Sequence, residues 1–183
     1  MVGFIVGLVL GLVNAFKKEP SPALILAYAA FIGVGLGGIS FAFQSQWQGI
    51  VQQAILGTLA VFGVALFAYR SGRIRVTPKF RRMVLIGMMG YLAFSLVNVL
   101  FMVFGSGDNA FGLRSGWLGI AAGLIGVALA AFSLVLDFDF IDKGVQNAIP
   151  VKYAWTAAFG LVVTLVWLYL ELLRLIAIFS GQD

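Results

Sequence analysis

Long, uninterrupted apolar runs constrain this chain more than any other feature of its sequence. They cover residues 1–16, 22–43, 50–69, 83–104, 117–136 and 153–179. A helix needs about 20 apolar residues to cross a hydrocarbon layer about 30 Å thick. Strands of a membrane barrel instead alternate apolar and polar residues over about 10 positions. The runs therefore predict an all-α, polytopic transmembrane helix bundle that forms one domain over residues 1–183.

The amino-acid composition agrees with a lipid-facing exterior. Hydrophobic residues make up 62% of the chain and charged residues 10%, whereas soluble domains average about 45–50% and about 25%. A small soluble domain cannot bury so much apolar surface. The chain also has no cysteine and no histidine, which excludes disulfides and removes the commonest metal ligand. Any proton chemistry must therefore rest on carboxylates.

Basic residues gather in alternate loops between the apolar runs. The chain has 12 Lys and Arg against 7 Asp and Glu, a formal net charge of +5. In a soluble protein this excess would suggest nucleic acid, but here we expect the lipid bilayer as partner and no nucleic acid. With six spans, one side holds Lys17, Lys18, Arg70, Arg73, Arg75, Lys79, Arg81, Arg82, Lys143 and Lys152, and the other holds Arg114 and Arg174. Because Lys and Arg favour cytoplasmic loops, we expect the first side to be cytoplasmic.

This orientation places both termini on the outer side and makes the first run unusual. The run begins at Met1 and has about 16 residues, with no polar segment before it. A first span that begins outside normally follows a leader or another span. We therefore expect an upstream helix that this sequence lacks.

Glycine is frequent in the runs, with 23 in the chain. Gly33 and Gly37 form a G-x-x-x-G motif, which allows two helix backbones to approach closely in a membrane. We interpret this motif as a helix-packing feature rather than a ligand site.

Ionisable residues inside the apolar runs point most directly to function, because charges are costly in a bilayer. Glu171 lies about eight residues before the outer end of the last run, and Arg174 follows at i+3 on the same helix face. These two residues either serve function or only neutralise each other. Asp137 and Asp139 lie where the fifth run ends, about 200° apart around a helix, so at most one should point into the bundle. Together with Asp142, they could equally form a solvated helix end.

Familiar enzyme signatures are missing from the sequence. We find no His-based metal motif, no Walker-type phosphate loop and no G-x-S-x-G nucleophile elbow. An intramembrane aspartyl protease would need two Asp residues deep in separate spans, and here only Glu171 is deep. We therefore expect a protein that is not an enzyme.

Four segments carry a family resemblance. They are residues 132–141 (FSLVLDFDFI), 168–175 (LYLELLRL), 53–58 (QAILGT) and 73–80 (RIRVTPKF). Their order and spacing resemble the Bax inhibitor/YccA-like family, also called the transmembrane Bax inhibitor motif family, and in particular a bacterial branch of it. The resemblance covers essentially the whole chain.

The resemblance implies a seven-helix fold with the last helix surrounded by the other six, located in the bacterial inner membrane. It also implies a pH-sensitive calcium leak, in which one acidic residue late in the sixth helix pairs with another in the seventh. These residues map to Asp137 and Glu171, which would also be the calcium ligands, and no other cofactor is expected. The candidate supporting residues are Asp139, Arg174, Lys17 and Lys18. YccA-like members suggest an alternative, a non-conducting protein that binds a membrane protease or another membrane complex.

The spacing of the two acids bears on whether they can pair. Two carboxylates at hydrogen-bond distance share a proton, and after deprotonation their repulsion opens a site with oxygen ligands for calcium. Asp137 and Glu171 are 34 positions apart, so in a simple hairpin turning near Asn147 their depths differ by about 20 Å. They can meet only if part of residues 141–155 forms an extra excursion. Otherwise Glu171 pairs with Arg174 or with the first span.

Overall fold

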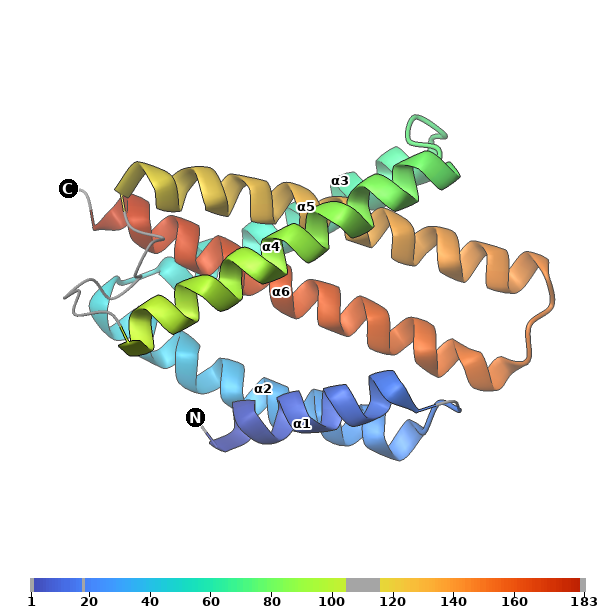
Figure 1. The fold of residues 1–183 in the computed structure, drawn as a ribbon, viewed down its shortest axis with the longest axis horizontal. Helices are drawn as coiled ribbons and strands as arrows, with labels where there is room; N and C mark the ends of the chain where they lie inside the picture. Colours follow the sequence, from blue (N-terminus) through green and yellow to red (C-terminus); the bar gives the residue numbers. More distant parts are fainter. Residues whose placement is uncertain (1, 18, 105–115, 182–183) are drawn as a thin grey trace.

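The computed structural model describes residues 2–17, 19–104 and 116–181. Its helices are α1 (Val2–Phe16), α2 (Pro22–Gln46), α3 (Ile50–Arg70), α4 (Pro78–Phe104), α5 (Gly116–Gln146) and α6 (Ala154–Ser180), with a short 3₁₀ helix, η2 (Val151–Tyr153), before α6. Each helix follows one of the apolar runs, and the described residues contain no strand (Figure 1). The predicted all-α, polytopic membrane bundle is confirmed.

Helix length separates α1 from the rest. Among the described residues, five helices are long and apolar enough to cross a membrane, namely α2, α3, α4, α5 and α6. Helix α1 has 15 residues, which is about 22 Å of helix and less than the hydrocarbon thickness of about 30 Å. Of the six predicted spans, five therefore correspond to helices long enough to cross a membrane, and the first is as short as its apolar run indicated.

Helix α5 continues beyond its predicted end. The fifth apolar run ends at Leu136, whereas the helix runs on to Gln146. The helix is longer than the apolar run because polar residues extend a helix as readily as apolar ones when they pair along its surface. Lys143 and Asp139 form such a pair, with 2.7 Å between Nζ and Oδ2.

Helix α4 also begins earlier than predicted, at Pro78 rather than Met83. The hydroxyl of Thr77 accepts a hydrogen bond of 3.1 Å from the backbone N–H of Phe80, which caps the first turn. Proline suits the position after a cap, because its missing N–H has no partner there anyway.

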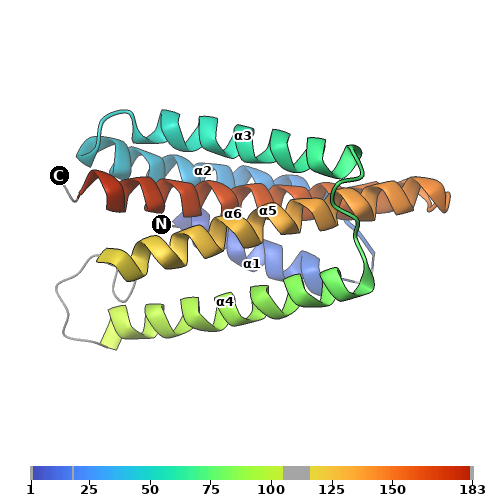
Figure 2. The ribbon, with the colours of Figure 1, turned by 90° about the horizontal axis from the view of Figure 1, so that it is seen from above.

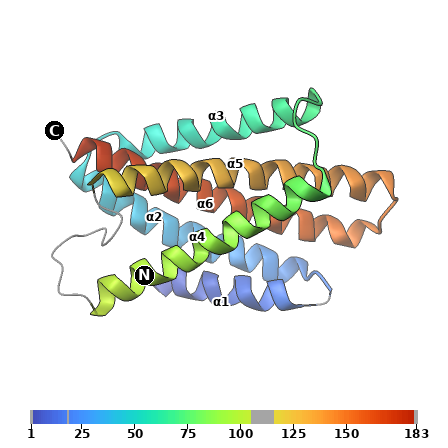
Figure 3. The same cartoon turned by 45° about the horizontal axis from the view of Figure 1, so that its top comes forward.

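Helix α6 lies at the centre of the packing. It contacts α2, α3 and α5, whereas α1 packs on α2 alone and α4 packs on α5 alone by backbone proximity. Figure 2 shows α6 beside α5 along most of its length, and Figure 3 shows α4 crossing this pair obliquely. A side chain on the inner face of α6 can therefore meet several helices at once.

Glycine positions decide how closely α1 and α2 approach. A Cβ built at Gly35 would lie 2.9 Å from the backbone nitrogen of Phe4, so only glycine fits there without a shift. A Cβ at Gly33 or Gly37 would meet nothing within 4 Å among the described residues. The packing role predicted for Gly33 and Gly37 is therefore wrong here, because a different face of α2 meets α1.

The connections α1–α2, α3–α4 and α5–α6 lie at one end of the bundle (Figure 1). We call this the basic end, because it holds Lys17, Arg70, Arg73, Arg75, Lys79, Arg81, Arg82, Lys143 and Lys152. Lys18, which the sequence analysis places there too, lies outside the described residues. The α5–α6 hairpin reaches beyond the ends of the other helices on this side (Figure 2).

Candidate functional site

The candidate carboxylates lie along one antiparallel helix pair, α5 and α6. A Cβ built at Gly160 of α6 would lie 3.3 Å from Oδ1 of Asp137 on α5. Further along, a Cβ at Gly126 of α5 would lie 2.9 Å from the carboxyl carbon of Glu171 on α6. Both contacts fit a single register of α5 against α6. The segment between the two helices therefore lengthens the hairpin and does not shift one acid toward the other.

Asp137 faces α6 near the basic end. Its Oδ2 accepts a hydrogen bond of 2.7 Å from the hydroxyl of Thr164, which is buried. Its Oδ1 lies beside Gly160, where no side chain fills the space. Asp137 is half-buried and has no ion pair among the described residues. This site is therefore a carboxylate with one hydroxyl donor and no counter-charge.

The neighbouring acids of α5 face other partners. Asp139 pairs with Lys143, and Asp142 accepts hydrogen bonds from the hydroxyl of Tyr69 at 3.1 Å and from Gln146 at 2.8 Å. The rotation of about 200° between Asp137 and Asp139 explains why these two side chains point apart. Of the three acids, Asp137 is the one that contacts α6.

Glu171 forms a second polar site two helical turns beyond Thr164. The residue is only 4% exposed. Its Oε1 accepts a hydrogen bond of 3.3 Å from the indole N–H of Trp167, and its Oε2 forms a salt bridge with Nη2 of Arg174. The same Nη2 donates to the hydroxyl of Tyr91 on α4 at 3.0 Å. This cluster therefore joins α4 to α6 across α5.

The cluster depends on the absence of a side chain at Gly126. A Cβ there would lie 2.5 Å from the hydroxyl oxygen of Tyr91 and 2.9 Å from Oε2 of Glu171. The rings of Tyr91 and Trp167 lie against each other, with centroids 5.7 Å apart. Polar and aromatic groups from α4 and α6 thus meet over one glycine of α5.

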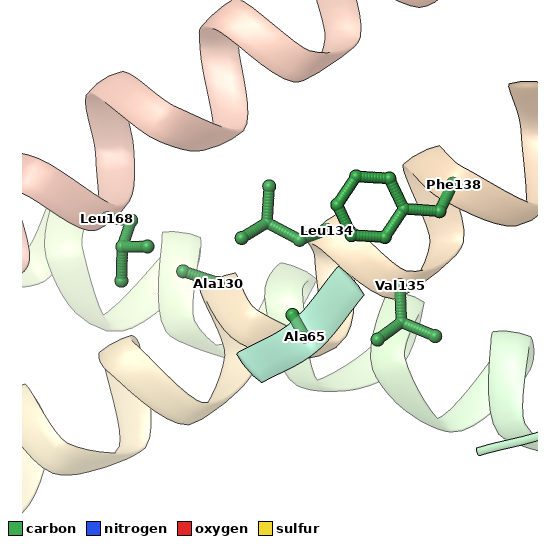
Figure 4. Close-up of a cluster of buried hydrophobic side chains, with 6 residues drawn as sticks. All are labelled: Ala65, Ala130, Leu134, Val135, Phe138 and Leu168. Atoms are coloured by element: carbon green, nitrogen blue, oxygen red, sulfur yellow. The ribbon is translucent and has the colours of Figure 1, made fainter. Parts of the chain in front are cut away.

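A dry apolar layer separates the two polar sites. Ala130, Leu134 and Leu168 are each 0% exposed, and Figure 4 shows them with the neighbouring Ala65, Val135 and Phe138. Thr164 and Glu171 are seven residues apart on α6, a rise of about 10 Å. The structure therefore does not bring Asp137 and Glu171 together, and Glu171 pairs with Arg174 instead. Within the described part of the chain, no group of three or more acidic residues could hold a metal ion.

A comparison with protein families identifies the family of this chain. The model of the family described as Bax inhibitor 1 like matches residues 1–181. The chain belongs to this family. No curated protein matches the chain, and no solved structure matches it.

In this Bax inhibitor 1 like protein, Lys17, which was predicted to support the acidic pair, lies away from both carboxylates. Lys17 is exposed in the connection after α1, and Lys18 lies outside the described residues. The salt bridge of Glu19 with Lys152, 2.9 Å long, lowers the pKa of Glu19, and the charge of Lys17 adds to this effect. The charge of Lys17 therefore acts on Glu19 at the surface of the basic end.

Three residues of the two sites escaped the sequence analysis. Trp167 lies four residues before Glu171, and Thr164 lies seven residues before it, so both share its helix face. That spacing could have indicated them as partners. Tyr91 gave no such signal, because its contact with Arg174 depends on how α4 crosses the α5–α6 pair.

Proposed function

We propose that this Bax inhibitor 1 like protein is a cation leak of the bacterial inner membrane, with calcium as the permeating ion and carboxylate protonation as its control. In this proposal the basic end faces the cytoplasm, since Lys and Arg favour that side. One observation carries the proposal. Two carboxylates lie in a single helix interface at two depths, and a dry apolar layer separates them.

Each layer has a distinct part in such a leak. Asp137 is near the basic end and has no counter-charge within the described part of the chain, so its carboxylate can attract a cation, and protonation removes that attraction. Leu134 and Leu168 form a constriction that excludes water and ions, as hydrophobic gates do in other channels. Glu171 offers the next carboxylate beyond this constriction, once the guanidinium group of Arg174 moves away from it. The arrangement therefore corresponds to a closed state.

Calcium flux into proteoliposomes over a pH series tests the proposal. Wild type should conduct with a clear pH dependence, and Asp137→Asn combined with Glu171→Gln should lose that dependence. Asp142→Asn is the matched control, because this acid lies on the same helix but is exposed and bonds Tyr69. Identical flux for wild type and the double variant over the whole series would rule out gating by these acids.

A second candidate is a non-conducting protein that binds a membrane protease or another membrane complex. The α5–α6 hairpin favours it, because its tip exposes apolar side chains at the basic end, with Val145 76% and Val151 87% exposed. This function predicts no flux in proteoliposomes and copurification of a partner. Val145→Ser with Val151→Ser should then release the partner, whereas the same change at Val64, an exposed residue of α3, should not. Neither candidate requires a cofactor or a catalytic step.

A further inference from the structure

The carboxylate of Glu171 is already occupied by a cation, the guanidinium group of Arg174. Its Oε2 pairs with Nη2 of Arg174, and its Oε1 accepts the indole N–H of Trp167. Both oxygens are thus in use, and the side chain of Glu171 is only 5% exposed. A calcium ion needs six to eight oxygen ligands, so this carboxylate offers calcium no free oxygen while Arg174 remains in place.

The surroundings make this occupancy specific to a cation. The carboxylate lies against Gly126 and the hydroxyl of Tyr91. The side chain of Arg174 is 16% exposed and forms a salt bridge with Glu171. Removing one partner of a buried ion pair leaves the other charge less compensated, which is strongly unfavourable. The vacated site should therefore attract another cation of similar shape.

Arg174 uses only part of its hydrogen-bonding capacity to hold Glu171 and Tyr91. A single nitrogen, Nη2, makes its contacts with both Glu171 and Tyr91, so the paired two-nitrogen geometry of strong Arg–carboxylate contacts is not used. Nε is buried with no hydrogen-bond partner among the described residues. Ser180, the last residue of α6, lies six residues further on, a rise of about 9 Å. A long arginine side chain can extend toward that end of the helix and reach water.

We infer that Arg174 is a tethered plug, which holds the cation site of Glu171 in the closed protein and must be displaced by a permeating cation. The occupied site follows from the contacts alone. The role as a plug rests on the proposed cation leak. The two parts can therefore be tested separately.

The site is tested by chemical rescue. Arg174→Ala removes the guanidinium group and leaves space beside Glu171, Tyr91 and Trp167. In detergent its melting temperature should fall by several degrees and should recover with millimolar guanidinium chloride, but not with sodium chloride at equal concentration. Arg174→Ala with Glu171→Gln is the matched control and should show no rescue. If guanidinium raises the melting temperature of Arg174→Ala no more than that of wild type, the cation site beside Glu171 is refuted.

The plug is tested by flux in proteoliposomes. Arg174→Ala should conduct several-fold more than wild type, and millimolar guanidinium should return its flux toward the wild-type level without affecting wild type. Arg174→Lys, which keeps the charge, should stay near wild type. Arg174→Gln provides a second variant with the same expectation as Arg174→Ala, should the smaller side chain prevent folding. If wild type conducts and Arg174→Ala conducts equally, the plug is refuted but the leak is not. If neither wild type nor any variant conducts, the proposed leak is refuted, and the plug with it.

Discussion

The glycine beneath the Glu171 cluster allows the sharpest test of the geometry. Gly126→Ala adds one methyl group, whose carbon would lie 2.5 Å from the hydroxyl oxygen of Tyr91 and 2.9 Å from Oε2 of Glu171. Contacts this short cannot persist, so the tyrosine, the ion pair or the two helices must shift. Because the cluster joins α4 to α6, the shift should loosen α4.

The expected magnitude follows from three terms. Alanine in place of glycine within a helix is favourable by roughly 0.5–1 kcal/mol. Overpacking a filled site costs about 1–3 kcal/mol, and separating a buried ion pair costs about 3–5 kcal/mol. We therefore expect Gly126→Ala to lower the free energy of unfolding by about 0–2.5 kcal/mol if Glu171 and Arg174 stay paired. If the pair separates and so relieves the overpacking, the loss should be about 2–4.5 kcal/mol.

Unfolding in a denaturing-detergent titration measures this change. Gly63→Ala is the matched control, because its methyl group would meet nothing within 4 Å, and it should be neutral or slightly stabilising. Tyr91→Phe removes the nearest atom, so Gly126→Ala should cost less in that background, as a double-mutant cycle would show. Equal effects of Gly126→Ala and Gly63→Ala would refute the packing argument.

Three further outcomes check other parts of the structure. Leu168→Ala should lower the free energy of unfolding by about 2–5 kcal/mol, since the residue is fully buried in the apolar layer. The same change should raise cation flux, and an unchanged flux would show that the apolar layer is not a barrier to ions. Gly35→Ala should lower the melting temperature and Gly37→Ala should not, because only the first methyl group meets α1; similar melting temperatures would contradict the contact. Lys152 holds the pKa of Glu19 in the folded protein below its ordinary value. The pair therefore stabilises the folded state at any pH above that ordinary pKa, and this stabilisation is lost as the pH falls through the lowered pKa. The melting temperature of Glu19→Gln should thus approach that of wild type in acid, and a gap that widens there would disprove the assignment.

The sequence alone was sufficient for the helices and for the arrangement of charge along the chain. Apolar runs of about 20 residues have one stable form in a bilayer, because every backbone polar group must bond within its own helix. The alternation of spans then placed the loops that hold Lys17, Arg73 and Lys152 at one end. The limit appears at the end of α5, where the apolar run stops at Leu136 although polar residues continue the helix to Gln146.

The partners within the site were decided by tertiary structure. The sequence left Glu171 with Asp137, Arg174 or the first span as its partner. The register of α5 against α6 places Asp137 beside Thr164, about 10 Å along α6 from Glu171, and Glu171 pairs with Arg174. Glycine composition likewise could not tell Gly126, which lies under the side chains of Tyr91 and Glu171, from Gly33, where a Cβ would meet nothing within 4 Å among the described residues. The physical reason is the same in both cases. Local sequence determines a helix and the angle of each side chain around it, but only the packing of one helix on another determines what that side chain meets.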